Sequence, residues 1–355
     1  MQASSPEPHD EPLTRRAGAW AFVALLALSF LSAPGKVVAD TKLDLTANPI
    51  DFLARAANVW SSQSPLGQVQ NQAYGYFFPH GAFFALGQFL HVPPWITQRL
   101  WWALLLFAGF WGIIRLTEAL RTGSRGSRVV AAAAFVLTPQ VLTTLGAISS
   151  ETAPVMLAPW VLLPLVQMLQ GHDAPLRNLA ARSAVAVALM GAVNAVATGF
   201  ACAVAALWWL LHVRVNRHSA GTRNFWTFSA WWAVCVALAT TWWIVPLLIM
   251  GRVSPPFLEF IESSRATTQW ASLPEVLRGT TSWSPFISDE RLAGAMLTTT
   301  PAAVVVTGLV ACAGIAGLTM RRMPKRGVWA TVLLVGLAAI GAGYASGLGS
   351  PFAEP

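Results

Sequence analysis

The sequence predicts an all-α protein, a polytopic transmembrane helical bundle with about nine spans and with amphipathic helices in two large outer loops. Of its 355 residues, 55% are hydrophobic and only 11% are charged, whereas a soluble domain carries about 25% charged residues. The 17 tryptophans indicate the same class, because Trp gathers where lipid meets water. This composition excludes a disordered chain, because disordered segments are rich in charge and poor in apolar residues. It also argues against a water-soluble enzyme. We therefore predict that the protein is embedded in the lipid bilayer.

Eight uncharged stretches mark the expected spans. A helix crosses the hydrocarbon layer with about 20 mostly apolar residues, whose backbone groups are paired within the segment. The stretches are Ala17–Gly35, Leu100–Ile114, Val129–Ser150, Thr152–Gly171, Ser183–Val213, Asn224–Gly251, Leu292–Met320 and Gly327–Ala353. We interpret Ser183–Val213 as two short helices that meet near Gly191–Gly199, which gives nine spans; one long tilted helix is the alternative.

The distribution of charge favours an amino terminus on the cytosolic side. With nine spans, 15 of the 23 basic residues lie in the inner loops and the inner tail, and 10 of the 15 acidic residues lie outside. This follows the excess of Lys and Arg that cytoplasmic loops carry. The net charge of +8 is therefore explained by topology, and no nucleic-acid partner is expected. The predicted location is the plasma membrane, with multiple passes.

The chain is expected to form one membrane domain, residues 17–355, after a disordered cytosolic tail, residues 1–16. Arg15 and Arg16 followed by an apolar stretch also resemble a cleavable signal, but the stretch exceeds the usual signal core of about 7–15 residues. We therefore expect a retained anchor.

Two outer segments, at about residues 40–98 and 252–300, are longer than ordinary connections, which rarely exceed about 12–15 residues. The first contains the aromatic-rich stretch Tyr74–Phe84, and Ala82–Leu90 is apolar but too short to span. We expect this segment to lie flat at the outer interface. Folded structure against the outer leaflet is where chemistry on a lipid head group would take place.

The strongest candidates for chemistry follow the first span. Asp40 and Asp44 flank Lys42 at the predicted outer surface. Burial near lipid raises the pKa of a carboxyl group and a nearby cation lowers it, and such a carboxylate can take a proton from an attacking hydroxyl. A solvated cluster of charges is the alternative interpretation.

Three further residues are candidates in the neighbouring outer segments. Glu151 is the only charge between Arg128 and Asp173, and an ionisable group at this depth is either functional or a helix cap. His80 lies among aromatic residues and either contacts a phosphate or is an interfacial histidine. Arg99 begins a span and either anchors it at the interface or holds a lipid phosphate.

The second outer segment contributes a weaker signal. Glu259, Glu262 and Arg265 have the spacing of one short helix near the membrane, a pattern that is most often a solvated face. Nucleotide-binding and zinc-protease motifs are absent from the sequence, and so are carboxylates in the middle of the spans. The three cysteines lie far apart in apolar stretches and indicate neither disulfides nor a zinc site.

Several peptides resemble the mycobacterial and corynebacterial α-(1→3)-arabinofuranosyltransferases, a family of multi-span enzymes with the GT-C fold. The similar stretches are Val38–Leu45, Gln70–Tyr76, Phe78–Phe84, Thr97–Trp102 and Ile148–Thr152. The resemblance implies an inverting transfer of arabinofuranose from a decaprenyl-phosphate donor to the arabinan of arabinogalactan and lipoarabinomannan. The active site would face the extracytoplasmic side. The family's chains are longer, so this sequence, which stops at Pro355, is expected to be truncated at its C-terminus.

The resemblance also implies roles for residues. Asp40 matches the expected base best and Asp44 second, with Glu151 as a further catalytic candidate. Candidates for binding the donor phosphate or the substrates are Lys42, His80, Arg99, Glu262 and Arg265. Carboxylates can also bind a divalent cation, so no cofactor is assigned and a cation stays open. The rival classes are a lipid-linked saccharide flippase or other secondary transporter, which would show midplane polar groups and internal repeats, and a noncatalytic scaffold.

Overall fold

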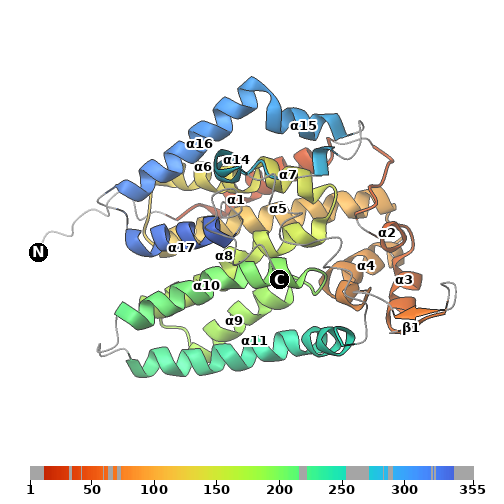
Figure 1. The fold of residues 1–355 in the computed structure, drawn as a ribbon, viewed down its shortest axis with the longest axis horizontal. Coiled ribbons are helices and arrows are strands. Elements are labelled where there is room, and N and C mark those ends of the chain that lie inside the picture. Colours follow the sequence, from red (N-terminus) through yellow and green to blue (C-terminus); the bar gives the residue numbers. More distant parts are fainter. Residues whose placement is uncertain are drawn as a thin grey trace, which may run out of the picture. The chain divides into compact units, whose positions relative to one another are not determined.

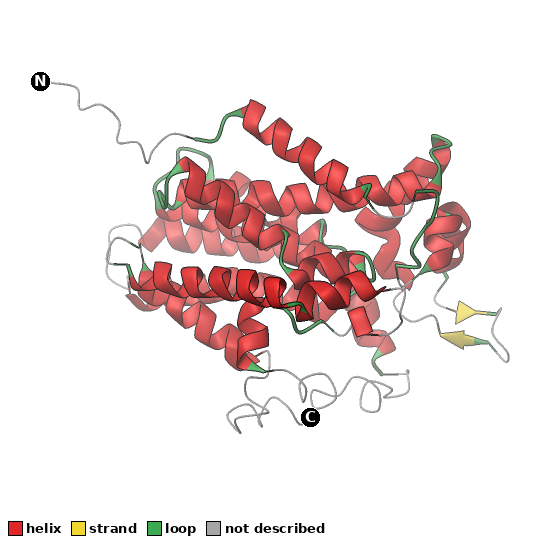
Figure 2. Cartoon of the chain, turned by 90° about the horizontal axis from the view of Figure 1, so that it is seen from above, coloured by secondary structure: helices red, strands yellow, loops and turns green. Residues whose placement is uncertain are grey.

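The computed structural model describes residues 12–31, 34–40, 42–58, 60–62, 67–69, 73–215, 222–252, 272–282, 284–286, 291–320, 323 and 325–339. Within these ranges the secondary structure is helical apart from one antiparallel pair of two-residue strands, β1 (Trp60–Ser61) and β2 (Gln68–Val69) (Figure 2). The predicted all-α class is confirmed. The chain divides into two compact units, Met1–Val136 with Leu145–Arg252, and Leu137–Thr144 with Val253–Pro355.

The first unit is built on two long helices that pack along each other, α5 (Pro94–Ala119) and α8 (Ser149–Leu169). Their neighbours follow in sequence, and several run side by side in Figure 1. α1 and α6 pack against α5, α9 and α10 pack against α8, and α11 packs against α9. The bounds are α1 (Arg15–Ser29), α6 (Arg125–Val136), α9 (Leu176–Ala188), α10 (Ala195–Val215) and α11 (Thr222–Met250).

Small residues on α5 allow α8 to approach closely. A Cβ added at Gly112 would lie 2.7 Å from Trp160 Nε1 and 3.1 Å from Pro159 Cβ. The Trp160 indole N–H instead donates to the backbone oxygen of Ala108, at 2.8 Å. Helices in membranes associate through such small-residue contacts, because apolar side chains gain little by leaving lipid.

The segment predicted as the first outer loop folds into a layer of short helices at one end of this bundle. The layer has its own core of Leu45, Phe52, Ala56, Ala73 and Tyr76. The apolar stretch Ala82–Leu90, which is too short to span, forms α4. The bounds are α2 (Leu43–Ala47), α3 (Pro49–Ala56), η1 (Ala73–Tyr76), η2 (Phe77–Gly81) and α4 (Ala82–Phe89).

The predicted count of nine spans is not confirmed. Five helices in the described chain are long and apolar enough to cross a membrane, or six if the bent pair α6 and α7 counts as one span. Three other predicted spans contain shorter helices: α1 has 15 residues, α9 has 13 and α17 (Arg326–Ala339) has 14. Uncharged stretches overestimate helix length, because they run on through breaks such as the one before Pro139.

The interpretation of Ser183–Val213 as two helices is correct, and a single tilted helix is wrong. α9 ends at Ala188 and α10 begins at Ala195. Between them Gly191 has a φ of +76°, a conformation that glycine adopts without steric cost. The side-chain oxygen of Asn194 then accepts a hydrogen bond from the backbone N–H of Ala197, at 2.9 Å, and so caps the start of α10.

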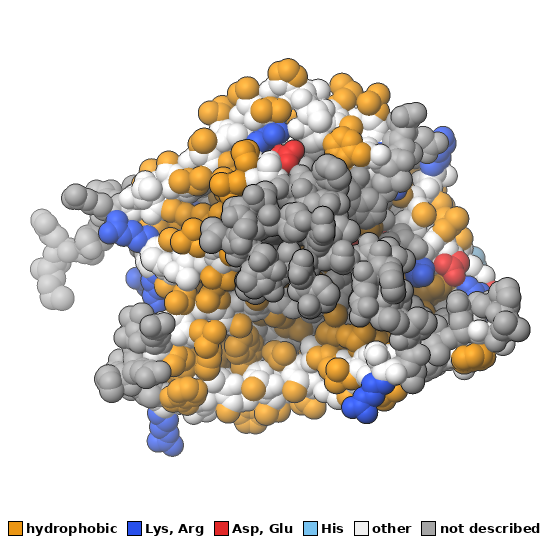
Figure 3. Space-filling model, viewed as in Figure 1, with side chains coloured by type: hydrophobic (Ala, Val, Ile, Leu, Met, Phe, Trp, Pro, Cys, Tyr) orange, Lys and Arg blue, Asp and Glu red, His pale blue; other side chains and the backbone are white. Residues whose placement is uncertain are grey.

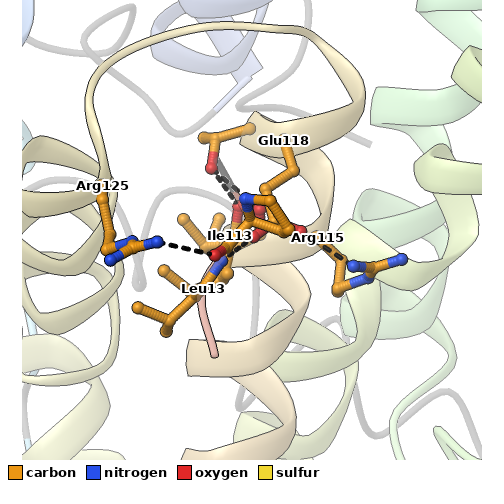
Figure 4. A network of polar contacts seen from close by, with 8 residues as sticks. Leu13, Ile113, Arg115, Glu118 and Arg125 are labelled. Carbon is orange, nitrogen blue, oxygen red and sulfur yellow. Dashed lines mark hydrogen bonds and ion pairs between the residues drawn. The ribbon is translucent and has the colours of Figure 1, made fainter. Parts of the chain in front are cut away.

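Segments predicted to lie on the cytosolic side meet at the end of α5 (Figure 4). The backbone N–H of Leu13 donates to Glu118 Oε1 at 2.7 Å, and Arg115 pairs with Glu118 Oε2 at 2.8 Å. Arg125 donates to the backbone oxygen of Pro12 at 3.4 Å. The other end of α5 packs against α4 and α2 of the layer that follows the first helix, so segments predicted for opposite sides of the membrane lie at opposite ends of α5.

The second unit contains α7 (Pro139–Leu145) up to Thr144, with α14, α15, α16 and α17. The side chain of Ser272 caps α14 (Leu273–Arg278). Arg278 donates to the backbone oxygen of Thr298 at 2.8 Å, which ties α14 to α15 (Leu292–Thr299). It also donates to the hydroxyl of Thr307 at 2.9 Å, on α16 (Pro301–Thr319). This unit also includes the short η3 (Ser284–Phe286).

The outer surface of the bundle is apolar. Hydrophobic side chains cover much of the described surface in Figure 3, including the region of α10 and α11 at the bottom of the view. On α11 the exposed apolar side chains include Val234, Leu238, Val245, Leu248 and Ile249. A surface of this kind suits contact with lipid, and the protein is a multi-pass membrane protein.

Candidate functional site

Asp40 joins the segment after the first helix to the start of α8. Its side chain is 2% exposed. Oδ1 accepts a hydrogen bond from the backbone N–H of Ser149 and Oδ2 accepts one from the Ser149 hydroxyl, both at 2.6 Å. Ser149 is the first residue of α8, where helical N–H groups lack partners within the helix. Asp40 therefore caps α8 from a distant part of the chain, and the positive end of the helix dipole favours its negative charge.

Burial raises the pKa of Asp40 from 3.8 to about 6, and the two hydrogen bonds from Ser149 oppose this rise. The nearby Trp102 indole N–H, which has no hydrogen-bond partner among the described residues, also lowers the pKa of Asp40. The backbone of Asp40 has a φ of +44°, in the left-handed region that Asp enters more readily than most residues other than glycine. Asp40 is thus a carboxylate that ionises near neutral pH in a water-poor place.

Trp101 on α5 connects Asp40 to His80 through Ser149. Trp101 donates its indole N–H to the Ser149 hydroxyl at 3.0 Å. On its other side the Trp101 ring stacks on His80, with ring centroids 4.9 Å apart and planes at 17°. His80 is 4% exposed, and Tyr76 and Phe84 also pack against its ring. His80 therefore orders Trp101, which in turn contacts the serine that binds Asp40.

Arg99 and Gln98 hold the segment that leads to Asp40. The Gln98 side-chain amide accepts from the backbone N–H of Val38 at 3.0 Å and donates to the backbone oxygen of Val38 at 2.8 Å. Arg99 donates to Gln98 Oε1 at 3.0 Å and to the backbone oxygen of Lys36 at 3.2 Å. Its Cζ lies 4.2 Å from the centroid of the Trp102 ring, a cation–π contact. Arg99 is 1% exposed, so it does not extend to the surface as an anchor would.

Glu151 lies in the first turn of α8, two residues after Ser149, and is half-buried. Its Oε1 accepts a hydrogen bond from the side-chain amide of Asn194, at 3.0 Å. Because Asn194 also caps α10, this contact links the starts of α8 and α10. The layer of short helices reaches the same place, where the backbone N–H of Ala192 donates to the oxygen of Gly75 at 3.2 Å.

Asp44 and Lys42 stand apart from this cluster. Asp44 forms an ion pair with Arg55 at 3.1 Å, and both side chains are about half exposed. Lys42 precedes α2 and is partly exposed. Asp40 and Asp44, the two carboxylates predicted as candidates for the base, therefore have different surroundings. Asp40 is buried against the bundle, and Asp44 lies in a solvated ion pair. Glu262 and Arg265 lie outside the described residues.

Several buried polar atoms of the first unit have no hydrogen-bond partner among the described residues, and native proteins leave few such atoms unpaired. They are His80 Nδ1, Arg99 Nε, Trp102 Nε1, Ser150 Oγ, Thr152 Oγ1 and Thr198 Oγ1. Among the described residues, no three His, Cys, Asp or Glu side chains form a metal-binding group.

Sequence reasoning identified four members of the cluster and missed the residues that join them. Asp40, His80, Arg99 and Glu151 are connected through Ser149, Trp101 and Trp102, near the starts of α5 and α8. Ser149, Trp101, Trp102 and Gln98 had no predicted role. The available signal was their position in the two peptides Thr97–Trp102 and Ile148–Thr152, next to residues that had been singled out.

The burial of His80 predicts a pH-dependent stability. Burial lowers the pKa of His80 from 6.5 to about 3, so between these values the unfolded chain binds more protons than the folded one. The stabilisation is complete above about pH 6.5 and is lost as the pH falls towards 3, by about 2 kcal/mol at pH 5. His80→Phe keeps the ring stack and cannot take up a proton. Its free energy of unfolding relative to the wild type is expected to rise by about 2 kcal/mol from pH 7 to pH 5.

Denaturant unfolding in detergent micelles at both pH values measures this difference. Asp40 is present in both the wild type and His80→Phe, so its contribution to the pH dependence of the free energy of unfolding cancels in the difference. His172→Phe, at an exposed histidine, is the matched control and is expected to leave the pH dependence as it is in the wild type. Equal pH dependence in His80→Phe and the wild type would contradict the buried, neutral state of His80.

Comparison with known proteins extends the resemblance of the short peptides to nearly the whole chain. A family model described as "Alpha-(1->3)-arabinofuranosyltransferase, N-terminal GT-C domain" matches residues 24–355. A curated α-(1→3)-arabinofuranosyltransferase of Mycolicibacterium smegmatis is 61% identical over 330 residues, which are 93% of this chain and 23% of that protein. The one of Mycobacterium tuberculosis is 56% identical over 345 residues, 97% of this chain and 24% of that protein.

A solved structure agrees with these matches. The cryo-EM structure of the arabinofuranosyltransferase AftD from mycobacteria superposes with a TM-score of 0.80 at 57% identity, over 93% of this chain and 23% of that one. The chain thus spans about a quarter of the length of the relatives it matches. Apolar helices and this superposition define a membrane protein of the GT-C class of glycosyltransferases. Within this class, the chain belongs to the family of α-(1→3)-arabinofuranosyltransferases.

Proposed function

We propose that the protein transfers arabinofuranose from a decaprenyl-phosphate donor to the arabinan of the cell wall, at the outer face of the plasma membrane and with inversion at the sugar carbon. Membership of the arabinofuranosyltransferase family supports the sugar and the reaction class. One observation supports the place of the reaction above the others. It is the buried Asp40 carboxylate, whose two oxygens are held by the backbone N–H and the hydroxyl of Ser149 at the start of α8.

In this proposal Asp40 is the general base. It takes the proton of the acceptor hydroxyl, the hydroxyl oxygen bonds to the sugar carbon, and the bond from that carbon to the lipid phosphate breaks. A base works best when its pKa lies near the working pH, and burial brings the pKa of Asp40 to about 6. Because Asp40 is 2% exposed, the mechanism requires the chain around it to open when substrates bind. Asp44 is the second candidate.

The leaving phosphate needs positive charge rather than an acid, because it is weakly basic. Arg99 is a buried guanidinium beside Trp102, with its Nε unpaired in the described chain, and a charge that is poorly screened attracts a phosphate strongly. We assign Lys42 and Arg265 as further candidates for this contact. Glu151 is assigned to orient a substrate, together with Glu262. His80 is assigned to the same task through Trp101.

The test is transfer of radiolabelled arabinofuranose from the synthetic decaprenyl-phosphate donor to an arabinan acceptor by membranes that contain the protein. Membranes that lack it serve as the control. Transfer above the control is the expected result, and analysis of the anomeric configuration of the product decides inversion. Movement of the donor across vesicles without transfer would overturn the proposal and identify the transporter class.

The proposed orientation has a separate test by cysteine labelling. In a variant whose three native cysteines are replaced by alanine, Leu43→Cys places a thiol at a side chain that is 52% exposed, beside the acidic segment. Gly126→Cys places one at the opposite end of α5, where a Cβ meets nothing within 4 Å. A membrane-impermeant maleimide is expected to label Leu43→Cys in intact cells and Gly126→Cys only after permeabilisation. The reverse pattern would place the site in the cytosol.

A further inference from the structure

Ser149 connects three parts of the first unit: α8, where it lies, α5, and the segment that contains Asp40. It is 0% exposed and starts α8. Its hydroxyl contacts Asp40 Oδ2 at 2.6 Å and the indole nitrogen of Trp101 at 3.0 Å, while its backbone N–H contacts Asp40 Oδ1 at 2.6 Å. Asp40 is 109 positions away in the sequence and Trp101 is 48 positions away.

The chemistry of these groups sets the direction of each hydrogen bond. An indole N–H can only donate, so the Ser149 hydroxyl accepts from Trp101. Its single proton is then donated to Asp40 Oδ2. Since the backbone N–H of Ser149 also donates, both carboxylate oxygens face donors. Protonation of Oδ2 would make the Ser149 hydroxyl rotate and give up its donation, and protonation of Oδ1 would weaken the bond from the backbone N–H, so this arrangement favours the ionised form of Asp40.

We propose that Ser149 is a positioning residue, which holds the Asp40 carboxylate in one orientation and in its ionised state, and that Trp101 fixes the hydroxyl of Ser149 for this purpose. The inference rests on the proposed role of Asp40 as the base. Buried carboxyl groups tend to stay protonated, and a protonated Asp40 could not accept the proton of an acceptor hydroxyl. Ser149 thus makes a base possible in a place that excludes water.

Other ionisable groups around Asp40 come from several elements. Arg99 of α5 lies against the Trp102 ring, His80 of η2 stacks on Trp101, and Glu151 follows Ser149 on α8. His80 stays neutral because burial lowers its pKa to about 3. None of these side chains is altered by a change at Ser149, so a shift in the titration of Asp40 can be attributed to the serine.

The experiment compares Ser149→Ala with the wild type by two measurements. Infrared difference spectra, recorded in steps from about pH 4 to about pH 8, follow the protonated carboxyl band that Asp40→Asn removes. The pH profile of arabinose transfer gives the midpoint of its acidic limb, which reports the same group. The wild-type midpoint is expected near 6. Loss of a hydrogen bond to a charged group is expected to move both midpoints upward by about one to two pH units in Ser149→Ala.

Ser183→Ala is the matched control. Ser183 is also 0% exposed, and its hydroxyl likewise accepts from an indole, that of Trp232, while it donates to the backbone oxygen of Val161. This variant removes an equally buried serine but is expected to leave both midpoints unchanged. Ser149→Cys, which keeps the volume and donates only weakly, is expected to move the midpoint in the same direction by less, and it replaces Ser149→Ala if that variant fails to fold.

An unchanged midpoint in Ser149→Ala, or an equal shift in Ser183→Ala, would overturn the role of Ser149. Failure of the proposed function looks different, because the wild type would then transfer no arabinose. In that case the infrared midpoint still decides the inference: a shift confined to the Ser149 variants supports it, and no shift overturns it.

Discussion

Asp40→Asn is expected to reduce the rate of arabinose transfer by about 10²–10⁴-fold, the range lost when a positioned general base is removed. The amide has nearly the same shape, but it cannot take the proton from the acceptor hydroxyl. Its neutral oxygen still accepts one hydrogen bond from Ser149, so the protein is expected to insert and fold. Initial rates with the radiolabelled decaprenyl-phosphate donor, normalised to the amount of folded protein, measure the loss.

Asp44→Asn provides the matched comparison for this prediction. Asp44 lies four residues further along, in an ion pair with Arg55 whose side chains are about half exposed, and such pairs contribute little to stability. The rate of this variant is expected to stay within about threefold of the wild type, which corresponds to the small energy of an exposed pair. A normal rate in Asp40→Asn, or a large loss in Asp44→Asn alone, would transfer the role of base away from Asp40.

Gly112→Val is expected to lower the free energy of unfolding by about 1–3 kcal/mol, because it forces additional methyl groups into a packed interface. The new Cβ would stand 2.7 Å from Trp160 Nε1, so α5 and α8 must separate or Trp160 must give up its bond to the oxygen of Ala108. The apparent melting temperature in detergent, followed by size-exclusion chromatography of heated samples, measures the effect.

Gly314→Val is the control for that substitution. Gly314 lies on α16, and a Cβ at this position meets nothing within 4 Å. The same change of residue is therefore expected to alter the stability by no more than about 0.5 kcal/mol, as is usual for sites without packing constraints. Equal melting temperatures for the two variants would contradict the close approach of α5 and α8.

The helical class follows from the sequence because it depends on composition, and the aromatic-rich stretch after the first helix indicated that this segment is folded. Arg115 and Glu118 meet Leu13 at the end of α5 where the basic loops are predicted to lie. The ends of the helices were harder to predict from the sequence. The break near Gly191 was predicted from the glycines around it, but nothing in an uncharged stretch reveals that α9 has only 13 residues.

The site was predictable as a set of residues but not as a structure. Asp40 is a candidate base because it follows the first predicted span, and the resemblance to the family's peptides supports the same role. Its partner, Ser149, lies 109 positions away, and the contact depends on how α5 and α8 pack. The difference between Asp40 and Asp44 has the same origin, because only tertiary structure decides which of two nearby carboxylates is buried.

The hydrogen bonds that Gln98 and Arg99 make with the segment before Asp40 have an evolutionary consequence. Their side chains bind the peptide groups of Lys36 and Val38 and none of the side chains in that stretch. The amino acids that precede Asp40 can therefore drift in identity while the carboxylate keeps its place. Proline at position 38 is the exception, since it lacks the amide hydrogen that Gln98 requires.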